Sequence, residues 1–120
     1  MDDLFNIRII NLREGAITAS QTVDREHPVY QGHFPGLPLT PGVCQLGMIR
    51  KILEQALGRS LQLMNSKNLK FTSMHDPRTQ SVLSAEITFE QEGEYLKANA
   101  SLAAGAETIF KFRGGYIEYR

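Results

Sequence analysis

The sequence has no tryptophan, a single cysteine, no excess charge of either sign and no long apolar run. The lone Cys44 cannot form an internal disulfide, and the scattered His27, His33 and His75 do not have the spacing of metal ligands. Thirteen Lys and Arg residues balance thirteen Asp and Glu residues, which disfavours nucleic acid and anionic membranes as partners. No stretch approaches the roughly 18 apolar residues that a membrane-spanning helix needs. We therefore expect a protein without metal, cofactor or membrane insertion.

The chain is 120 residues long and 42% apolar, which is enough for one domain with a thin core. No linker, repeat or low-complexity stretch divides it, so we expect residues 1–120 to form a single domain. The start, MDDLFNIRII, has neither a basic segment nor a sustained apolar one, unlike a secretory signal. These features favour a cytoplasmic protein.

One segment has the pattern of an amphipathic helix. Apolar residues recur at helical spacing from Val43 to Leu57, with polar residues between them. Thr40 suits the N-cap, Pro41 suits the first helical position, and Gly58 suits the position just past the end. The sequence predicts a helix over residues 41–57.

The remaining apolar runs have the character of strands. Residues 5–12 and 16–23 flank a turn at Gly15, and about four further extended runs follow the helix. This order predicts an α+β fold in which one long helix lies on an antiparallel sheet of about six strands. A single sheet leaves exposed edges and an apolar flank that a second copy can cover, so we expect a homodimer.

The segment between the second strand and the helix, QGHFPGLPLTPGV, is rich in proline and glycine around His33. Proline fixes φ and stiffens the segment, and histidine is suited to proton transfer near neutral pH. The helix that follows offers unpaired N–H groups at Gly42 and Val43, where an oxyanion can be held. Because Gly42 has no side chain, we expect a carbonyl oxygen to approach it freely. The alternative is a shaped turn with no chemistry.

The same segment resembles the signature of the FabA/FabZ-type 3-hydroxyacyl-[acyl-carrier-protein] dehydratases, which is roughly G-H-F-P-G-x-P-x-x-P-G-V. The matching residues are Gly32, His33, Phe34, Pro35, Gly36, Pro38, Pro41, Gly42 and Val43. Further on, LKFTSMHDPRTQ resembles a second family segment less well, with Lys70, Phe71 and Pro77 in corresponding places.

The resemblance implies the hotdog fold, in which a curled antiparallel sheet wraps one central helix, usually as a homodimer or an assembly of dimers. It implies substrates that are acyl thioesters on acyl carrier protein or coenzyme A, in fatty acid synthesis or a specialised acyl or polyene pathway. In this family the histidine removes the C2 proton, the glycine N–H binds the thioester carbonyl, and water leaves from C3. His33 would then be the base and Gly42 the oxyanion donor. Substrate would lie against Phe34, Pro35, Gly36, Val43 and Gly47.

Position 47 departs from the family pattern. The family places Glu or Asp four residues after the valine of P-G-V, and this chain has Gly47. Glu54 is on the same helical stripe but about 10 Å further along the axis, so we do not expect it to substitute. Gln45 cannot donate a proton as an acid does, although its amide can orient a water. Chemically suitable groups also precede the loop: Asp24, Glu26 and His27.

Without the acid, two other activities stay open. One is a non-catalytic hotdog subunit that binds acyl carrier protein or pairs with a catalytic partner, and the other is a hotdog thioesterase. Elsewhere we expect Cys44 and Met48 to be core residues, and His75 to lie in a solvated turn. Several basic residues are candidates for contact with an acidic carrier protein: Arg50, Lys51, Arg59, Lys67, Lys70 and Arg78.

Overall fold

A computed structural model describes residues 4–31 and 39–119. Its elements, in chain order, are β1 (Phe5–Arg13), β2 (Ala16–Val23), the 3-10 helix η1 (Pro28–Gln31), α1 (Gly42–Leu57), β3 (Leu61–Phe71), β4 (Val82–Glu92), β5 (Tyr95–Ala104) and β6 (Glu107–Glu118). The strands form one antiparallel sheet of six, in the order β1-β2-β4-β5-β6-β3. The predicted α+β architecture is confirmed.

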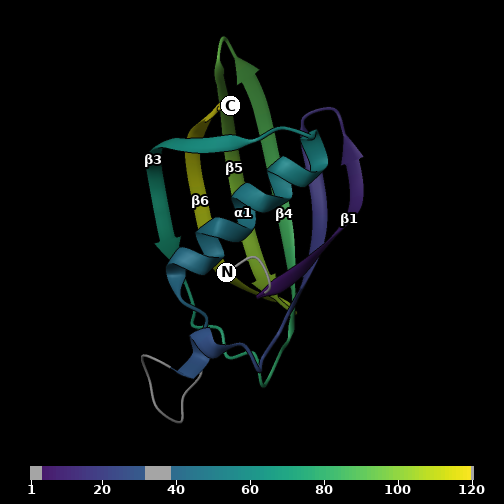
Figure 1. Ribbon diagram of the computed structural model, residues 1–120, viewed down its shortest axis with the longest axis vertical. Helices are drawn as coiled ribbons and strands as arrows, with labels where there is room; N and C mark the ends of the chain where they lie inside the picture. Colours follow the sequence, from purple (N-terminus) through teal and green to yellow (C-terminus); the bar gives the residue numbers. More distant parts are fainter. Residues whose placement is uncertain (1–3, 32–38, 120) are drawn as a thin grey trace.

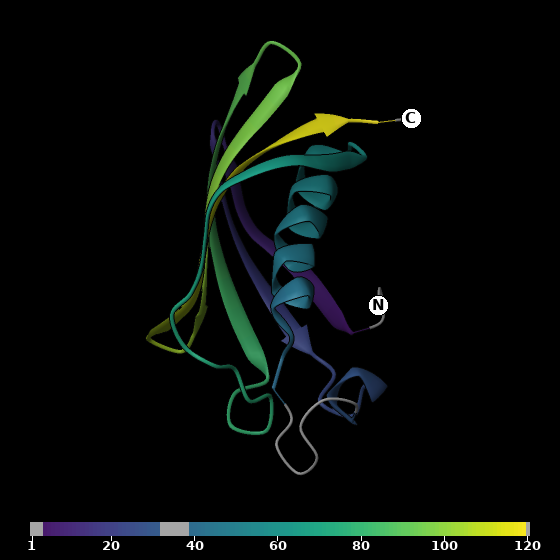
Figure 2. The same ribbon diagram turned by 90° about the vertical axis from the view of Figure 1, so that its left-hand side faces the viewer.

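The sheet curls around α1. Figure 2 shows the helix on the concave side, and Figure 1 shows it crossing the sheet diagonally, with β1 and β3 at opposite edges. Met48, Ile49, Ile52 and Leu53 are fully buried against the sheet. Apolar side chains on one face of α1 therefore supply the centre of the core.

Two turns follow the sequence prediction. Gly15 joins β1 to β2 with a φ of 76°, a value that glycine adopts without steric cost. Gly58 ends α1 in the left-handed region, with a φ of 67°, and donates its N–H to the carbonyl oxygen of Glu54. Both glycines therefore stand where a positive φ is needed.

The predicted start of the helix is wrong in one respect. The N-cap is Pro41, which makes no side-chain capping bond, and the helix begins at Gly42. The Thr40 hydroxyl is instead buried against two side chains from other parts of the chain. The buried face also differs, because Val43 in the first turn is 68% exposed.

In the part of the chain that the structure describes, no helix is long and apolar enough to cross a membrane. The same residues contain no group of three or more His, Cys, Asp or Glu side chains arranged to hold a metal ion.

Candidate functional site

The predicted site residues fall into two groups. Gly42, Val43 and Gly47 lie in the first two turns of α1. The others lie outside the described residues: His33, Phe34, Pro35 and Gly36. Gln31, the last residue of η1, and Leu39, three residues before α1, bracket that part of the chain.

The first turn of α1 presents two backbone donors. The Pro41 carbonyl oxygen accepts hydrogen bonds from the N–H groups of Cys44 and Gln45, at 3.0 and 3.2 Å. Among the described residues, no acceptor is bonded to the N–H groups of Gly42 and Val43. Because the N-terminal end of a helix carries partial positive charge, this pair suits an oxygen that gains negative charge.

Phe71 packs against Gly42. A Cβ atom placed on Gly42 would lie 2.5 Å from Cζ of Phe71, closer than non-bonded carbons approach. The Phe71 ring in turn stacks on Phe110, with 4.8 Å between ring centroids. The Phe71 ring therefore fills the space where a side chain at position 42 would begin, and a larger residue there would require that ring to move.

A buried hydrogen-bonded chain links residues on both sides of the loop. The hydroxyls of Tyr30 and Thr40 are 2.8 Å apart, and the Thr40 hydroxyl is 2.7 Å from Nδ1 of His75. Nε2 of His75 lies 2.6 Å from the Gln80 carbonyl oxygen. Since a carbonyl oxygen only accepts, Nε2 carries the proton and Nδ1 of the neutral ring accepts from Thr40. Tyr30 then donates to Thr40.

His75 is therefore structural, and the prediction of a solvated turn residue is wrong. Its side chain is only 2% exposed, and burial lowers the pKa of the imidazole, so that the neutral ring is favoured. The backbone adds a further link, from the Thr40 N–H to the His75 carbonyl oxygen at 2.9 Å. This network ties Tyr30, just before the loop, to Thr40, just before the helix.

Position 47 opens onto a cavity of about 270 Å³ on the outward side of α1. A Cβ atom placed on Gly47 would have no neighbour within 4 Å. Val43, Arg50 and Leu63 contribute to the lining, and none of the lining residues that the structure describes is an acid. The space for a longer side chain exists, but within the described residues the cavity offers no carboxylate.

Three of the groups considered as substitutes for the acid, Glu54, Asp24 and Gln45, make other contacts. Glu54 accepts a hydrogen bond from the Leu61 N–H at 2.7 Å and pairs with Arg50 at 3.3 Å. Asp24 accepts from the Glu26 N–H at 2.9 Å in the turn before η1. The amide nitrogen of Gln45 donates to the Thr40 carbonyl oxygen at 3.2 Å, while its buried Oε1 has no partner among the described residues. The expectation that Glu54 does not replace the acid agrees with these contacts.

Tyr116 packs behind the wall of this cavity, and the sequence reasoning did not single it out. It stands on β6 opposite Leu63 and is completely buried, and its ring meets that of Phe112 edge-on. Its hydroxyl has no hydrogen-bond partner among the described residues. Burial raises the pKa of the phenol. In the sequence GGYIEY, nothing distinguishes it from an ordinary strand aromatic.

Cys44 and Met48 are both buried in the core. Cys44 is 2% exposed, and burial raises the pKa of its thiol, which disfavours a thiolate. Met48 is fully buried. The prediction that both are core residues is confirmed.

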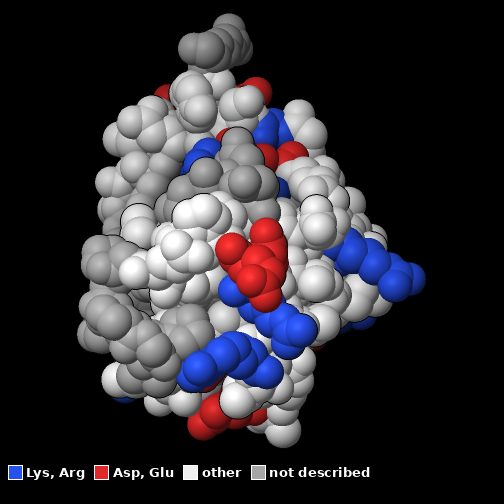
Figure 3. Space-filling model, turned by 60° about the horizontal axis from the view of Figure 1, so that its bottom comes forward, with Lys and Arg blue, Asp and Glu red and all other residues white. Residues whose placement is uncertain are grey.

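Charge is mixed at the end of the molecule where α1 begins. Figure 3 shows Lys and Arg side chains there around a small acidic group, not as a field of one sign. Several of the candidate basic residues make internal ion pairs, among them Arg59 with Glu118 and Arg78 with Asp76. These pairs leave less unopposed positive charge for an acidic partner.

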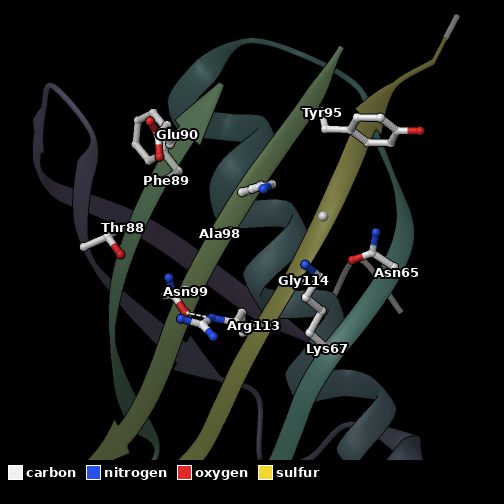
Figure 4. A pocket seen from close by; sticks show the side chains of 12 residues that line it. Asn65, Lys67, Thr88, Phe89, Glu90, Tyr95, Ala98, Asn99, Arg113 and Gly114 are labelled. Atoms are coloured by element: carbon white, nitrogen blue, oxygen red, sulfur yellow. Dashed lines mark hydrogen bonds between the residues drawn. The ribbon is translucent and has the colours of Figure 1, made fainter. Parts of the chain in front are cut away.

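A second hollow, of about 480 Å³, lies on the outer face of the sheet. Figure 4 shows it with α1 behind the strands and Lys67, Asn99 and Arg113 at its rim. Nε of Arg113 donates to the Asn99 amide oxygen at 3.0 Å. This hollow contains none of the predicted site residues.

Solved structures with the same fold include two with different chemistries. The dehydratase heterocomplex ApeI:P from Xenorhabdus doucetiae superposes with a TM-score of 0.71 and 18% identity, covering 93% of this chain and 94% of that one. A hypothetical thioesterase with coenzyme A from Streptococcus pneumoniae superposes with a TM-score of 0.72 and 12% identity, covering 99% and 91%. At these identities the likeness establishes the hotdog fold alone.

The sequence comparisons are more specific. The model of the ApeI-like family, described as ApeI dehydratase, matches residues 10–107. The 3-hydroxyacyl-[acyl-carrier-protein] dehydratase FabZ of Protochlamydia amoebophila is 32% identical over 114 residues, covering 86% of this chain and 74% of that enzyme. FabZ of Caulobacter vibrioides is 29% identical over 100 residues. That match covers 82% of this chain but only 58% of the length of the Caulobacter enzyme. The chain therefore belongs to the ApeI-like family of FabZ-type hotdog dehydratases.

Proposed function

We propose that this protein interconverts 3-hydroxyacyl and trans-2-enoyl thioesters, with His33 as the general base and the Gly42 N–H as the oxyanion donor. One observation carries the proposal. In a chain of a dehydratase family, the N–H groups of Gly42 and Val43, which have no acceptor among the described residues, follow shortly after His33 in the sequence.

The reaction is a loss of water across C2 and C3. His33 takes the C2 proton, the bond electrons form the C2–C3 double bond, and the C3–O bond breaks. Negative charge that develops on the thioester oxygen is held by the helix N-terminus, where one donor typically contributes about 10²- to 10³-fold. The departing oxygen needs a proton, and protonated His33 can return the one it took.

The substrate proposed is an acyl chain on acyl carrier protein or coenzyme A, as in fatty acid or polyene synthesis, and the assembly proposed is a homodimer. The names of the FabZ relatives support the carrier protein. Edge strand β3 supports the dimer, because Met64, Leu69 and Phe71 on it are 40–48% exposed. A second copy of β3 would pair the free edge and cover these side chains.

Gly47 favours a second candidate, a non-catalytic subunit that binds acyl carrier protein or pairs with a catalytic chain. The absence of a carboxylate from the described lining of the cavity supports it, as does the similarity to a protein of the ApeI:P heterocomplex. A thioesterase is the third candidate, supported by the thioesterases among the proteins of like fold.

An assay of trans-2-enoyl thioester hydration, monitored through the loss of enoyl absorbance, tests the proposal. Wild type, His33→Ala and Gly47→Glu are compared on both carriers. We expect activity in the wild type that falls by about 10²- to 10⁴-fold in His33→Ala. An inactive wild type with activity in Gly47→Glu would instead indicate a binding subunit. Activity that survives unchanged in His33→Ala would refute the assignment of the base.

A further inference from the structure

The hollow on the outer face of the sheet is open because small residues line it. Ala98 of β5 and the adjacent Gly114 and Gly115 of β6 are among these residues. Gly115 pairs with Lys97 on one side and with Asn65 on the other, so its missing side chain leaves a gap between them. The volume of about 480 Å³ falls within the roughly 300–1,000 Å³ that is typical of ligand pockets.

Two irregularities in β3 lie beside this hollow. The register between β3 and β6 shifts just before Asn65 and again just after Ser66, the two residues that pair with the glycines. Such bulges re-aim side chains and are frequent next to functional sites. Asn65 and Lys67 both line the hollow, and Figure 4 shows the Lys67 side chain directed from β3 towards β6.

Two cations of the hollow have no carboxylate partner. Among the described residues, no ion pair involves Lys67 or Arg113. The third cation, Lys97, pairs with Glu92 at 3.0 Å, and Glu90 is the single acid in the described lining. Positive charge therefore exceeds negative charge around the hollow, although the formal net charge of the chain is zero.

Arg113 is held in position by a neighbouring strand. Its Nε donates to the amide oxygen of Asn99 at 3.0 Å, and Asn99 lies directly opposite it on β5. Among the described residues, no acceptor is bonded to the other guanidinium N–H groups. A guanidinium can bind two oxygens of one phosphate group, and a lysine adds a compact charge beside it.

We propose that this hollow binds the phosphate group of a small organic phosphate, through Arg113 and Lys67 and over the gap at Gly115. The Tyr95 ring, which is 42% exposed and also lines the hollow, offers a face on which a ring of the same ligand can stack. Figure 4 shows α1 behind the strands, so the hollow faces away from the helix and the proposed dehydratase site. A dimer formed through the edge of β3 would leave it accessible, because strand side chains project above and below the sheet.

Calorimetric titration of the full chain tests the proposal, with AMP, ribose 5-phosphate, inorganic phosphate and adenosine as probes. The variants are Arg113→Met, Lys67→Met and Gly115→Val. Lys111→Met is the matched control, since Lys111 is exposed on β6 two residues from Arg113 but does not line the hollow. Gly115→Val fills the gap without changing charge, and a Cβ atom there meets only the side chain of the exposed Asn65, at 3.4 Å.

We expect AMP and ribose 5-phosphate to bind and adenosine not to bind. Arg113→Met, Lys67→Met and Gly115→Val should each raise Kd by about 10- to 100-fold. Lys111→Met should raise it by less than about 3-fold, because salt screens a charge that does not touch the ligand. Urea midpoints should stay unchanged in the methionine variants, which separates lost binding from lost folding.

The two organic probes distinguish the source of the phosphate. Tighter binding of AMP, with the difference lost in Tyr95→Leu, would indicate a nucleotide, and equal affinities would indicate a sugar phosphate. A wild type that binds neither organic phosphate would overturn the proposal. Equal losses in Lys111→Met and Arg113→Met would also overturn it, since a diffuse basic surface would then hold the anion. Inorganic phosphate that binds as tightly as both esters would refute an organic ligand.

Discussion

Replacing Thr40 with valine removes one hydroxyl from the centre of the buried network and keeps the shape of the side chain. His75 Nδ1 then loses its donor and the Tyr30 hydroxyl loses its acceptor. Tyr30 is 7% exposed and His75 2%, so water reaches neither group easily. Each orphaned buried group costs about 1–3 kcal/mol, and we expect the free energy of unfolding to fall by about 3 kcal/mol.

The measurement is urea unfolding near pH 7.5, with thermal unfolding beside it. For 120 residues, a loss of about 3 kcal/mol corresponds to a fall in Tm of roughly 12 °C. Thr40→Ser is the matched control, since it keeps the hydroxyl and should lose less than about 1 kcal/mol. A Thr40→Val protein within about 0.5 kcal/mol of wild type would refute the reasoning, because the network would then contribute nothing.

Three further outcomes are expected. Burial lowers the pKa of His75 below its usual 6.5, so just below that pH the unfolded chain binds more protons than the folded protein. The free energy of unfolding should therefore decline as pH falls from about 6.5. Urea midpoints that decline equally in a His75→Gln variant would contradict this. Gly42→Ala should lower the free energy of unfolding by about 1–3 kcal/mol, because the added methyl clashes with Phe71. In a double-mutant cycle, Phe71→Leu should relieve part of that loss. Additive losses from the two substitutions would argue against the contact. Gly47→Ala, with open space around the added methyl, should raise the free energy of unfolding by about 0.5–1 kcal/mol, whereas a loss would mean that the space is filled in solution.

Local rules predicted the features that local sequence determines. The turn at Gly15, the left-handed end of α1 at Gly58 and the alternating strands of the meander all arise from residues close together in the chain. The family signature likewise occupies one continuous stretch of sequence. These features were accessible without the structure.

The errors arose where distant residues meet. Thr40 has the side chain of an N-cap, but Tyr30 and His75, 10 and 35 residues away in sequence, bond its hydroxyl instead. His75 follows a polar-turn pattern, and its burial depends on that same contact. Tyr116 packs behind the cavity beside Gly47 only because β6 passes α1 there, some seventy residues away in sequence. Periodicity and motifs do not report such pairings.

The mass of the product formed from a trans-2-enoyl thioester by the wild-type protein tests the central claim most directly. The account predicts an intact thioester that has gained one water, in a reaction lost in His33→Ala. Free thiol with a released acid would identify a thioesterase, and an unchanged substrate with either carrier would contradict the assignment of a dehydratase.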